Sequence, residues 1–89
     1  MKIEYDPVKS DKNQRERGFS FSLASKFELD TALIRLDIRK QYGEPRFNAL
    51  GLIYDRLYHL TFTVKVDVIR IISLRKANKR EVKHYVRYY

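Results

Sequence analysis

Hydrophobic and polar residues alternate with a period of two through the middle of the chain. Such alternation is typical of β-strands with one buried face, and it predicts strands over residues 31–39, 46–54 and 57–65. A tight turn at Asp55-Arg56 connects the last two strands. The positions expected to face the core are Ala32, Ile34, Leu36, Ile38, Phe47, Ala49, Gly51, Ile53, Tyr58, Leu60, Phe62 and Val64.

The segment 68–74 (VIRIISL) is apolar on both faces apart from Arg70 and Ser73. A strand of this kind is expected in the middle of a sheet. Residues 42–45 (YGEP) predict a turn between the first two long strands. Gly18 is expected to end a helix, and Gly43 to lie in this turn.

Capping signals predict two helices near the N-terminus. Residues 3–5 indicate a short strand, after which Asp6 supplies an N-cap for a helix over residues 7–17. Ser20 begins a second, short helix that ends near residue 28.

A third helix is predicted at the C-terminal end of the chain. Asn78 and Glu81 have the spacing of a capping box. Because capping accounts for Glu81, no catalytic role is expected for it. Tyr88 lies off the apolar side of this helix and is free to stack on a base. The apolar stripe expected to pack against the core is Val82, Tyr85, Val86 and Tyr89.

The resulting order of elements, β-α-α-β-β-β-β-α, indicates an α+β fold. Short connections between consecutive strands favour a four-stranded antiparallel sheet, accompanied by the short N-terminal strand, with the two N-terminal helices and the C-terminal helix on one face. The opposite face of the sheet is then polar. By alternation it collects Arg35, Asp37, Arg46, Asn48, His59, Thr61, Thr63 and Arg70.

Two residues of this polar face are candidates for chemistry. A guanidinium in an apolar strand is costly unless it is paired or opens to a cleft, so Arg70 either binds an anion or forms a structural ion pair with Asp37 or Glu44. His59 is a candidate general acid or base, although a lone histidine on a strand is more often a bystander.

The net charge of the chain indicates which class of partner it binds. The 89 residues carry 19 Lys and Arg against 11 Asp and Glu, a net charge of +8. Most of the excess lies in residues 65–89, which points to an anionic partner, with nucleic acid as the first candidate. An ordinary solvated helix face is the alternative for the basic stretch Arg75, Lys76, Lys79, Arg80 and Lys83.

Missing features narrow the function classes. The chain has no cysteine, which excludes a disulfide scaffold, a thiolate zinc site and a cysteine nucleophile. No phosphate-binding glycine loop, HExxH motif or acidic cluster occurs, so we expect chemistry without metal or cofactor. Without a long apolar segment, we expect a cytoplasmic protein that makes no membrane contact.

The segment 68–81, read together with Tyr85, resembles the signature of BrnT-type toxins. The resemblance covers nearly the whole chain and implies a single BrnT/RelE-like domain over residues 1–89. The other matching positions are Tyr5, Asp6, Pro7, Lys9, Asn13, Gly18, Ser20, Phe21, Ala24, Phe27, Gly43, Glu44, Arg46 and Gly51.

This resemblance implies a RelE-like ribonuclease that cleaves RNA and inhibits translation. It also implies neutralisation by a BrnA-type antitoxin with a ribbon-helix-helix domain, so that operator DNA is contacted only through the antitoxin. The family commonly has Lys-His-Gly where this chain has Glu16-Arg17-Gly18. The alternative is therefore a non-catalytic nucleic-acid-binding protein or an inactive family member.

Combining motif and strand pattern gives a first mechanistic hypothesis. Arg46 and Arg70 hold the phosphate, Arg75 adds a second cation, and Glu44 or His59 carries the proton. The product is a 2',3'-cyclic phosphate. The further residues expected to contact RNA are Arg17, Arg35, Lys76, Lys79, Arg80 and Lys83.

Overall fold

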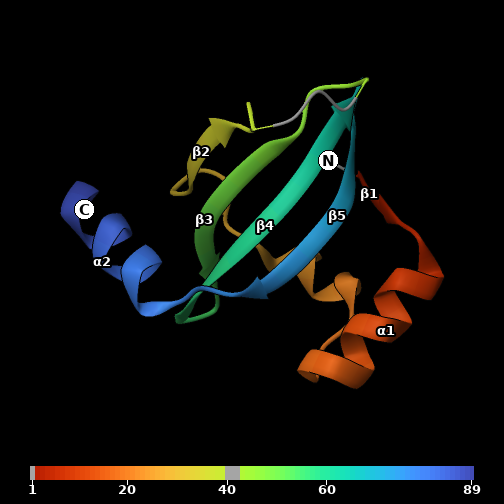
Figure 1. Ribbon diagram of the computed structural model, residues 1–89, viewed down its shortest axis with the longest axis horizontal. Helices are drawn as coiled ribbons and strands as arrows, with labels where there is room; N and C mark the ends of the chain where they lie inside the picture. Colours follow the sequence, from red (N-terminus) through yellow and green to blue (C-terminus); the bar gives the residue numbers. More distant parts are fainter. Residues whose placement is uncertain (1, 40–42) are drawn as a thin grey trace.

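The computed structural model describes residues 2–39 and 43–89. This part of the chain forms an α+β fold in which one five-stranded mixed sheet carries helices (Figure 1). Of the predicted turn at residues 42–45, Tyr42 lies outside the described residues. The elements are β1 (Lys2–Tyr5), α1 (Pro7–Arg17), the 3-10 helix η1 (Phe21–Lys26), β2 (Leu33–Leu36), β3 (Phe47–Ile53), β4 (Arg56–Lys65), β5 (Val68–Lys76) and α2 (Lys79–Tyr88).

The strands are ordered β1-β5-β4-β3-β2 across the sheet. Antiparallel pairing of β2 with β3, β3 with β4 and β4 with β5 confirms the predicted four-stranded unit. The short strand β1 joins the same sheet in parallel alongside β5. The prediction of an antiparallel sheet is therefore incomplete, because β1 adds a parallel pair. As an interior strand, β5 pairs on both sides.

Local capping explains where α1 begins and ends. The Asp6 carboxylate accepts a hydrogen bond of 2.9 Å from the Val8 N–H, and Pro7 occupies the first turn. At the other end, Gly18 adopts the left-handed conformation with φ 87° and donates its N–H to the Gln14 carbonyl. The helix predicted over residues 7–17 is confirmed.

The second predicted helix near the N-terminus is a 3-10 helix instead of an α-helix, and the Ser20 side chain makes no capping hydrogen bond to it. The spacing of its buried side chains explains the difference. Phe21, Ala24 and Phe27 follow one another at intervals of three residues and are all buried. A helix with three residues per turn places such positions on one side, toward the core.

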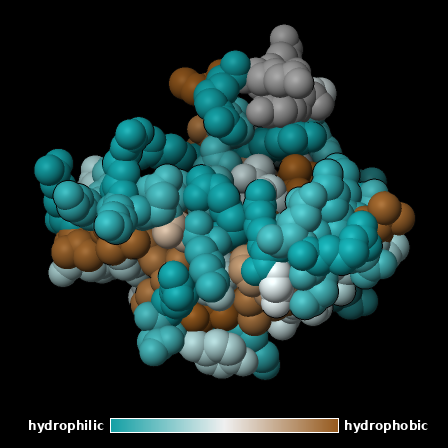
Figure 2. Space-filling view, turned by 60° about the horizontal axis from the view of Figure 1, so that its bottom comes forward, coloured by the Kyte–Doolittle hydropathy of each residue, from teal (hydrophilic) through white to brown (hydrophobic). Residues whose placement is uncertain are grey.

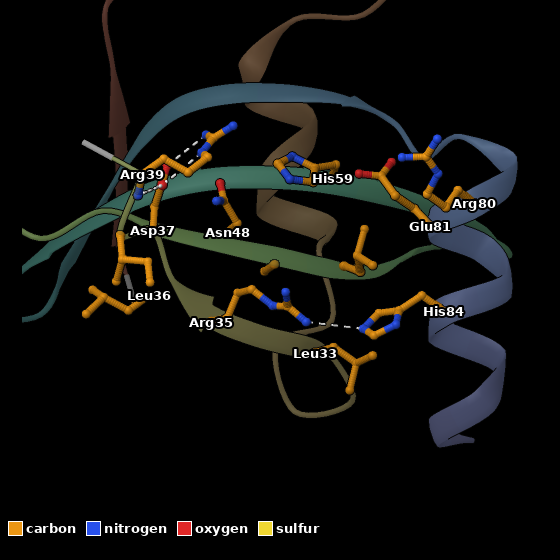
Figure 3. Close-up of a pocket in the computed structure, with 13 residues that line it drawn as sticks. Leu33, Arg35, Leu36, Asp37, Arg39, Asn48, His59, Arg80, Glu81 and His84 are labelled. Atoms are coloured by element: carbon orange, nitrogen blue, oxygen red, sulfur yellow. Dashed lines mark hydrogen bonds and ion pairs between the residues drawn. The ribbon is translucent and has the colours of Figure 1, made fainter.

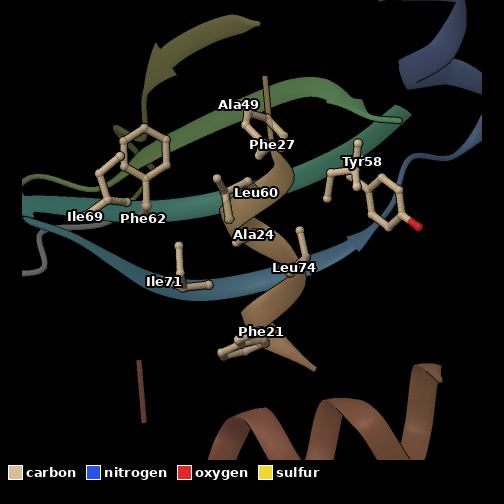
Figure 4. Close-up of a cluster of buried hydrophobic side chains, with 11 residues drawn as sticks. Phe21, Ala24, Phe27, Ala49, Tyr58, Leu60, Phe62, Ile69, Ile71 and Leu74 are labelled. Atoms are coloured by element: carbon tan, nitrogen blue, oxygen red, sulfur yellow. The ribbon is translucent and has the colours of Figure 1, made fainter. Parts of the chain in front are cut away.

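The core lies between η1 and one face of the sheet, as Figure 4 shows. It confirms the inward positions predicted on β3 and β4, with the exception of Val64, which is exposed. On β2, which spans only four of the residues predicted over 31–39, the prediction is wrong: Ile34 and Leu36 are exposed, as is Ile38 beyond the strand. The short edge strand lies beyond the surface that η1 covers, so alternation alone could not tell that its apolar side remains uncovered.

Gly51 lies within β3, inside the strand predicted over residues 46–54. A Cβ added at this position would overlap the ring of Phe27, which is itself in the core. We expect Gly51→Ala to lower the free energy of unfolding by about 1–3 kcal/mol through overpacking, measured by urea denaturation. Adding Phe27→Leu, which removes the ring, should make the cost of the double variant smaller than the sum of the two single costs. Strict additivity would show that the close approach is unimportant.

The C-terminal helix is capped as predicted but does not pack on the core. Asn78 and Glu81 form the complete capping box, yet no residue of α2 is buried. Its predicted core stripe is exposed at Val82, Val86 and Tyr89, and apolar surface is visible where α2 lies at the left of Figure 2. The helices therefore do not share one face: α1 and η1 lie on the core side, whereas α2 borders the polar side.

Candidate active site

The polar face of the sheet is built by cross-strand pairing. In the register of the strands, Asn48 lies opposite Thr61 and Arg35 lies opposite Asn48. In the next row on the same face, His59 lies opposite Arg75. Directly opposed side chains in an antiparallel sheet are in contact range. The predicted grouping of Arg35, Asn48, His59 and Thr61 on one face is thus confirmed.

A cleft of about 450 Å³ opens above this face, between β2, β3, β4 and α2. Its volume falls in the range of ligand-binding pockets. Figure 3 shows that side chains from the sheet and from α2 point into it from opposite sides. The polar residues that line it are Arg35, Asp37, Arg39, Asn48, His59, Arg80, Glu81 and His84.

An ion pair ties α2 to the sheet at one end of the cleft. Both guanidinium nitrogens of Arg75 donate to the carboxylate of Glu81, at 2.7 and 2.9 Å. This bidentate pairing lowers the pKa of Glu81 and raises that of Arg75, so both groups are charged at neutral pH. Glu81 therefore does more than cap the helix, and the expectation that capping alone accounts for it is wrong.

His59 faces this ion pair from β4. Burial lowers the pKa of His59 below its ordinary value of 6.5, and the positive charge of Arg75 lowers it further. Arg39 acts in the same direction, whereas Glu81 opposes them. Within the described part of the chain, the buried Nδ1 atom of His59 has no hydrogen-bond partner. At neutral pH the ring is thus an uncharged proton acceptor at the edge of a cleft.

The second histidine lies across the cleft on α2. Nη2 of Arg35 donates to Nε2 of His84 over 3.3 Å, and the ring of Tyr88 meets the His84 ring edge-on. The chain has two histidines, and both line this cleft. Sequence reasoning missed His84, although its spacing of three residues from Glu81 on a helix places the two on one face.

Asp37 and Arg39 close the other end of the cleft. The Arg39 guanidinium donates to the Asp37 carboxylate at 2.9 and 2.8 Å, which holds the pKa of that carboxyl well below its usual range. Asp37 is buried, as an aspartate can be when it is paired. The predicted ion pair between Asp37 and Arg70 is wrong, because Arg70 pairs with another residue.

Arg70 instead pairs with Glu4 of β1, at 3.3 Å, and both side chains are about half exposed. It lies opposite Thr63, four residues along β4 from His59. Four residues of strand span roughly 13 Å. The predicted grouping of Arg70 with His59 around one phosphate is therefore not what the structure forms.

The remaining predicted residues are spread over the surface. Glu44 is exposed in the loop before β3, and Arg46 precedes β3 at the Arg70 end of the sheet, where its carbonyl accepts the Asp37 N–H. Arg17 lies on α1, where it donates to the Leu74 carbonyl, and is not among the residues that line the cleft. The exposed basic residues at the start of α2 and just before it are Lys76, Lys79, Arg80 and Lys83, of which Arg80 lines the cleft.

Among residues 2–39 and 43–89, no three His, Asp or Glu side chains gather as they would around a metal ion. In the same part of the chain, every helix is too short or too polar to span a membrane.

Comparison with models of protein families shows that most of the chain matches one family. The family model described as "Ribonuclease toxin, BrnT, of type II toxin-antitoxin system" matches residues 5–81. This span includes every strand after β1, the residues that form the sheet side of the cleft, and Glu81 of α2. No curated protein and no solved structure matches the chain. The RelE-like part of the fold prediction therefore stays a prediction.

Proposed function

Because the chain belongs to the BrnT family of ribonuclease toxins of type II toxin–antitoxin systems, we propose that it cleaves RNA in the cleft between the polar sheet face and α2. The observation that carries this proposal is that His59 is a half-buried, uncharged imidazole in the lining of a cleft that also holds arginines. Cleavage of RNA at a 2'-hydroxyl needs a proton acceptor and cations around the phosphate, and both are present here.

In the proposed reaction, His59 takes the proton of the 2'-hydroxyl and the oxygen attacks the adjacent phosphorus. Arg35 and Arg80 line the cleft and hold the phosphate oxygens. Glu44, the other proton carrier expected from the sequence, is exposed in a loop and supports the role less well than His59. The chemistry requires no metal, and it leaves a 2',3'-cyclic phosphate.

The pH dependence of cleavage should report the environment of His59. Because its pKa lies below 6.5, kcat/KM should fall on the acid side with a midpoint below that value. Glu81→Gln removes the negative charge that raises this pKa and leaves Arg75 in place, so the midpoint should move to still lower pH. A midpoint that moves upward in this variant would contradict the arrangement of charges around His59.

Arg46 and Arg70 lie too far along the sheet to share a phosphate with His59 and are proposed to hold a neighbouring part of the RNA strand. Arg70→Gln should raise KM severalfold and reduce the salt dependence of RNA binding by about one unit of slope, while kcat stays near that of the parent. Binding titrations at several salt concentrations measure the slope. A fall in kcat as large as that of a His59 variant would show that Arg70 acts in the chemical step, and would contradict a role in binding alone.

The position of Arg17 favours a catalytic function over the alternative of an inactive or merely RNA-binding family member. The family position that commonly holds histidine is Arg17 here, and its side chain donates to the Leu74 carbonyl from α1. It is not one of the residues that line the cleft. Its replacement therefore removes no group from the proposed reacting centre.

The family assignment implies a protein antitoxin as partner. We propose a BrnA-type antitoxin with a ribbon-helix-helix domain, through which the complex binds its own operator DNA in the cytoplasm. An acidic segment of this partner laid over the polar sheet face would neutralise the arginines and exclude RNA together. Such binding should weaken as salt is raised.

Controlled expression in bacteria tests the proposed function. Induction of the parent chain should arrest growth and degrade cellular RNA, and co-expression of the antitoxin should restore both. His59→Gln, expressed to the same level, serves as the matched control and should leave growth and RNA intact. Growth arrest by the parent with fully intact RNA would contradict the ribonuclease function.

A further inference from the structure

A second imidazole, that of His84, lines the cleft and has no role in the mechanism proposed above. His84 projects from α2 into the cleft, while His59 projects from the sheet on the other side (Figure 3). Metal-free RNA cleavage has two proton transfers, one from the attacking 2'-oxygen and one to the departing 5'-oxygen. His59 accounts for the first of them.

The hydrogen bond of His84 shows which of its ring nitrogens lies toward Arg35. Arg35 carries only donors, so Nε2 of His84 must be the acceptor in the 3.3 Å contact between them. That nitrogen points at the residue proposed to bind phosphate. A phosphate bound by Arg35 would therefore lie beside the His84 ring.

We propose that His84 is the general acid that protonates the 5'-oxygen leaving group, an inference that rests on the proposed ribonuclease function. The 2'-oxygen transfers its proton to His59 and forms a bond to phosphorus. The bond from phosphorus to the 5'-oxygen breaks with its electron pair on oxygen, and that oxygen takes a proton from protonated His84. Exchange with water then returns both imidazoles to their starting states.

The arrangement of α2 supports this role. The helix is held against the sheet by polar contacts, among them the Arg75–Glu81 pair and the hydrogen bond from the Tyr85 hydroxyl to the Thr31 carbonyl at 3.0 Å. Glu81 and His84 lie on the same side of the helix, so the ion pair that anchors α2 also fixes the direction in which His84 points. The edge of the Tyr88 ring further restricts the imidazole.

A substrate with a better leaving group separates the general acid from other roles. Cleavage sites are first mapped on a mixed-sequence RNA, and an oligonucleotide is then made with sulfur in place of the 5'-bridging oxygen at one mapped site. A thiolate leaves without being protonated, because a thiol is far more acidic than an alcohol. Three variants are compared with the parent: His84→Gln, His59→Gln and Val86→Ala, the last a control at an exposed position of α2.

His84→Gln should cleave ordinary RNA roughly 100-fold or more slowly than the parent and should cleave the sulfur-bridged substrate at close to the parent rate. His59→Gln should be slow on both substrates, because both need the 2'-proton removed. Val86→Ala should behave as the parent on both, which shows that a substitution on α2 does not by itself lower the rate.

Two patterns would overturn the assignment. Equal loss by His84→Gln on both substrates would give His84 a positioning role, and full activity on both would give it none. A parent chain that cuts neither substrate would instead overturn the ribonuclease function itself, so the two failures are distinguishable.

Discussion

Replacing His59 with glutamine should lower the rate of RNA cleavage by roughly two to four orders of magnitude. The imidazole is uncharged at neutral pH because burial and Arg75 both disfavour its protonated form. Its buried Nδ1 has no partner in the described part of the chain. Glutamine is of similar size and can still form hydrogen bonds, but it cannot accept a proton. The change therefore removes the proposed chemistry and leaves the polar character of the position.

Two measurements belong with this prediction. Single-turnover cleavage with saturating enzyme measures the chemical step, and RNA binding by the variant should remain close to that of the parent because the arginines of the cleft are retained. Thermal unfolding shows that the variant folds. A variant that binds RNA, folds and cleaves at the parent rate would remove His59 from the mechanism.

The largest effect on stability is expected from Leu74→Ala. Leu74 is fully buried, at 0% exposure, in the layer between β5 and η1. Truncating a leucine in such a place removes apolar contacts and leaves a cavity, at a cost of about 2–5 kcal/mol. A small domain has a total stability of only about 5–15 kcal/mol, so this one substitution removes a large part of it.

Leu36→Ala is the matched control because it makes the same chemical change on an edge strand. Leu36 is 50% exposed, so its loss should cost less than about 1 kcal/mol. Urea denaturation of both variants gives the two free energies, provided that the slope with denaturant is unchanged. Similar costs for the two leucines would contradict the boundary of the core drawn here.

Alternation of apolar and polar residues predicted the buried face of β3 and of most of β4. It succeeded on β3 and β4 because η1 covers one face of these strands and leaves the other open. It failed at Ile34 and Leu36, whose side of β2 remains exposed. Strand periodicity indicates which residues share a face, whereas the reach of a helix over that face depends on tertiary packing.

The candidate site shows a similar division. Cross-strand register brings His59 opposite Arg75, a relation that strand assignment alone does not give. The position of α2 beside the sheet brings Glu81 and His84 into the lining of the cleft. In the sequence, Glu81 is recognisable only as a capping residue, and no pattern marks His84. Arg70 drew attention because it interrupts an apolar strand, yet its partner is Glu4 at the opposite end of the chain. An arginine within an apolar strand was a good indicator of a polar partner and a poor indicator of which residue that partner is.

The central claim is that this chain cleaves RNA through the 2'-hydroxyl in the cleft between the sheet and α2. The most direct test is mass spectrometry of the products from an oligonucleotide cut in the presence of a metal chelator, beside the same oligonucleotide with a single 2'-deoxy position at the cleavage site. The expected products are a 2',3'-cyclic phosphate and a 5'-hydroxyl from the first, with the second bound but uncut. Cleavage of the deoxy substrate, or a 5'-phosphate on the product, would contradict the account.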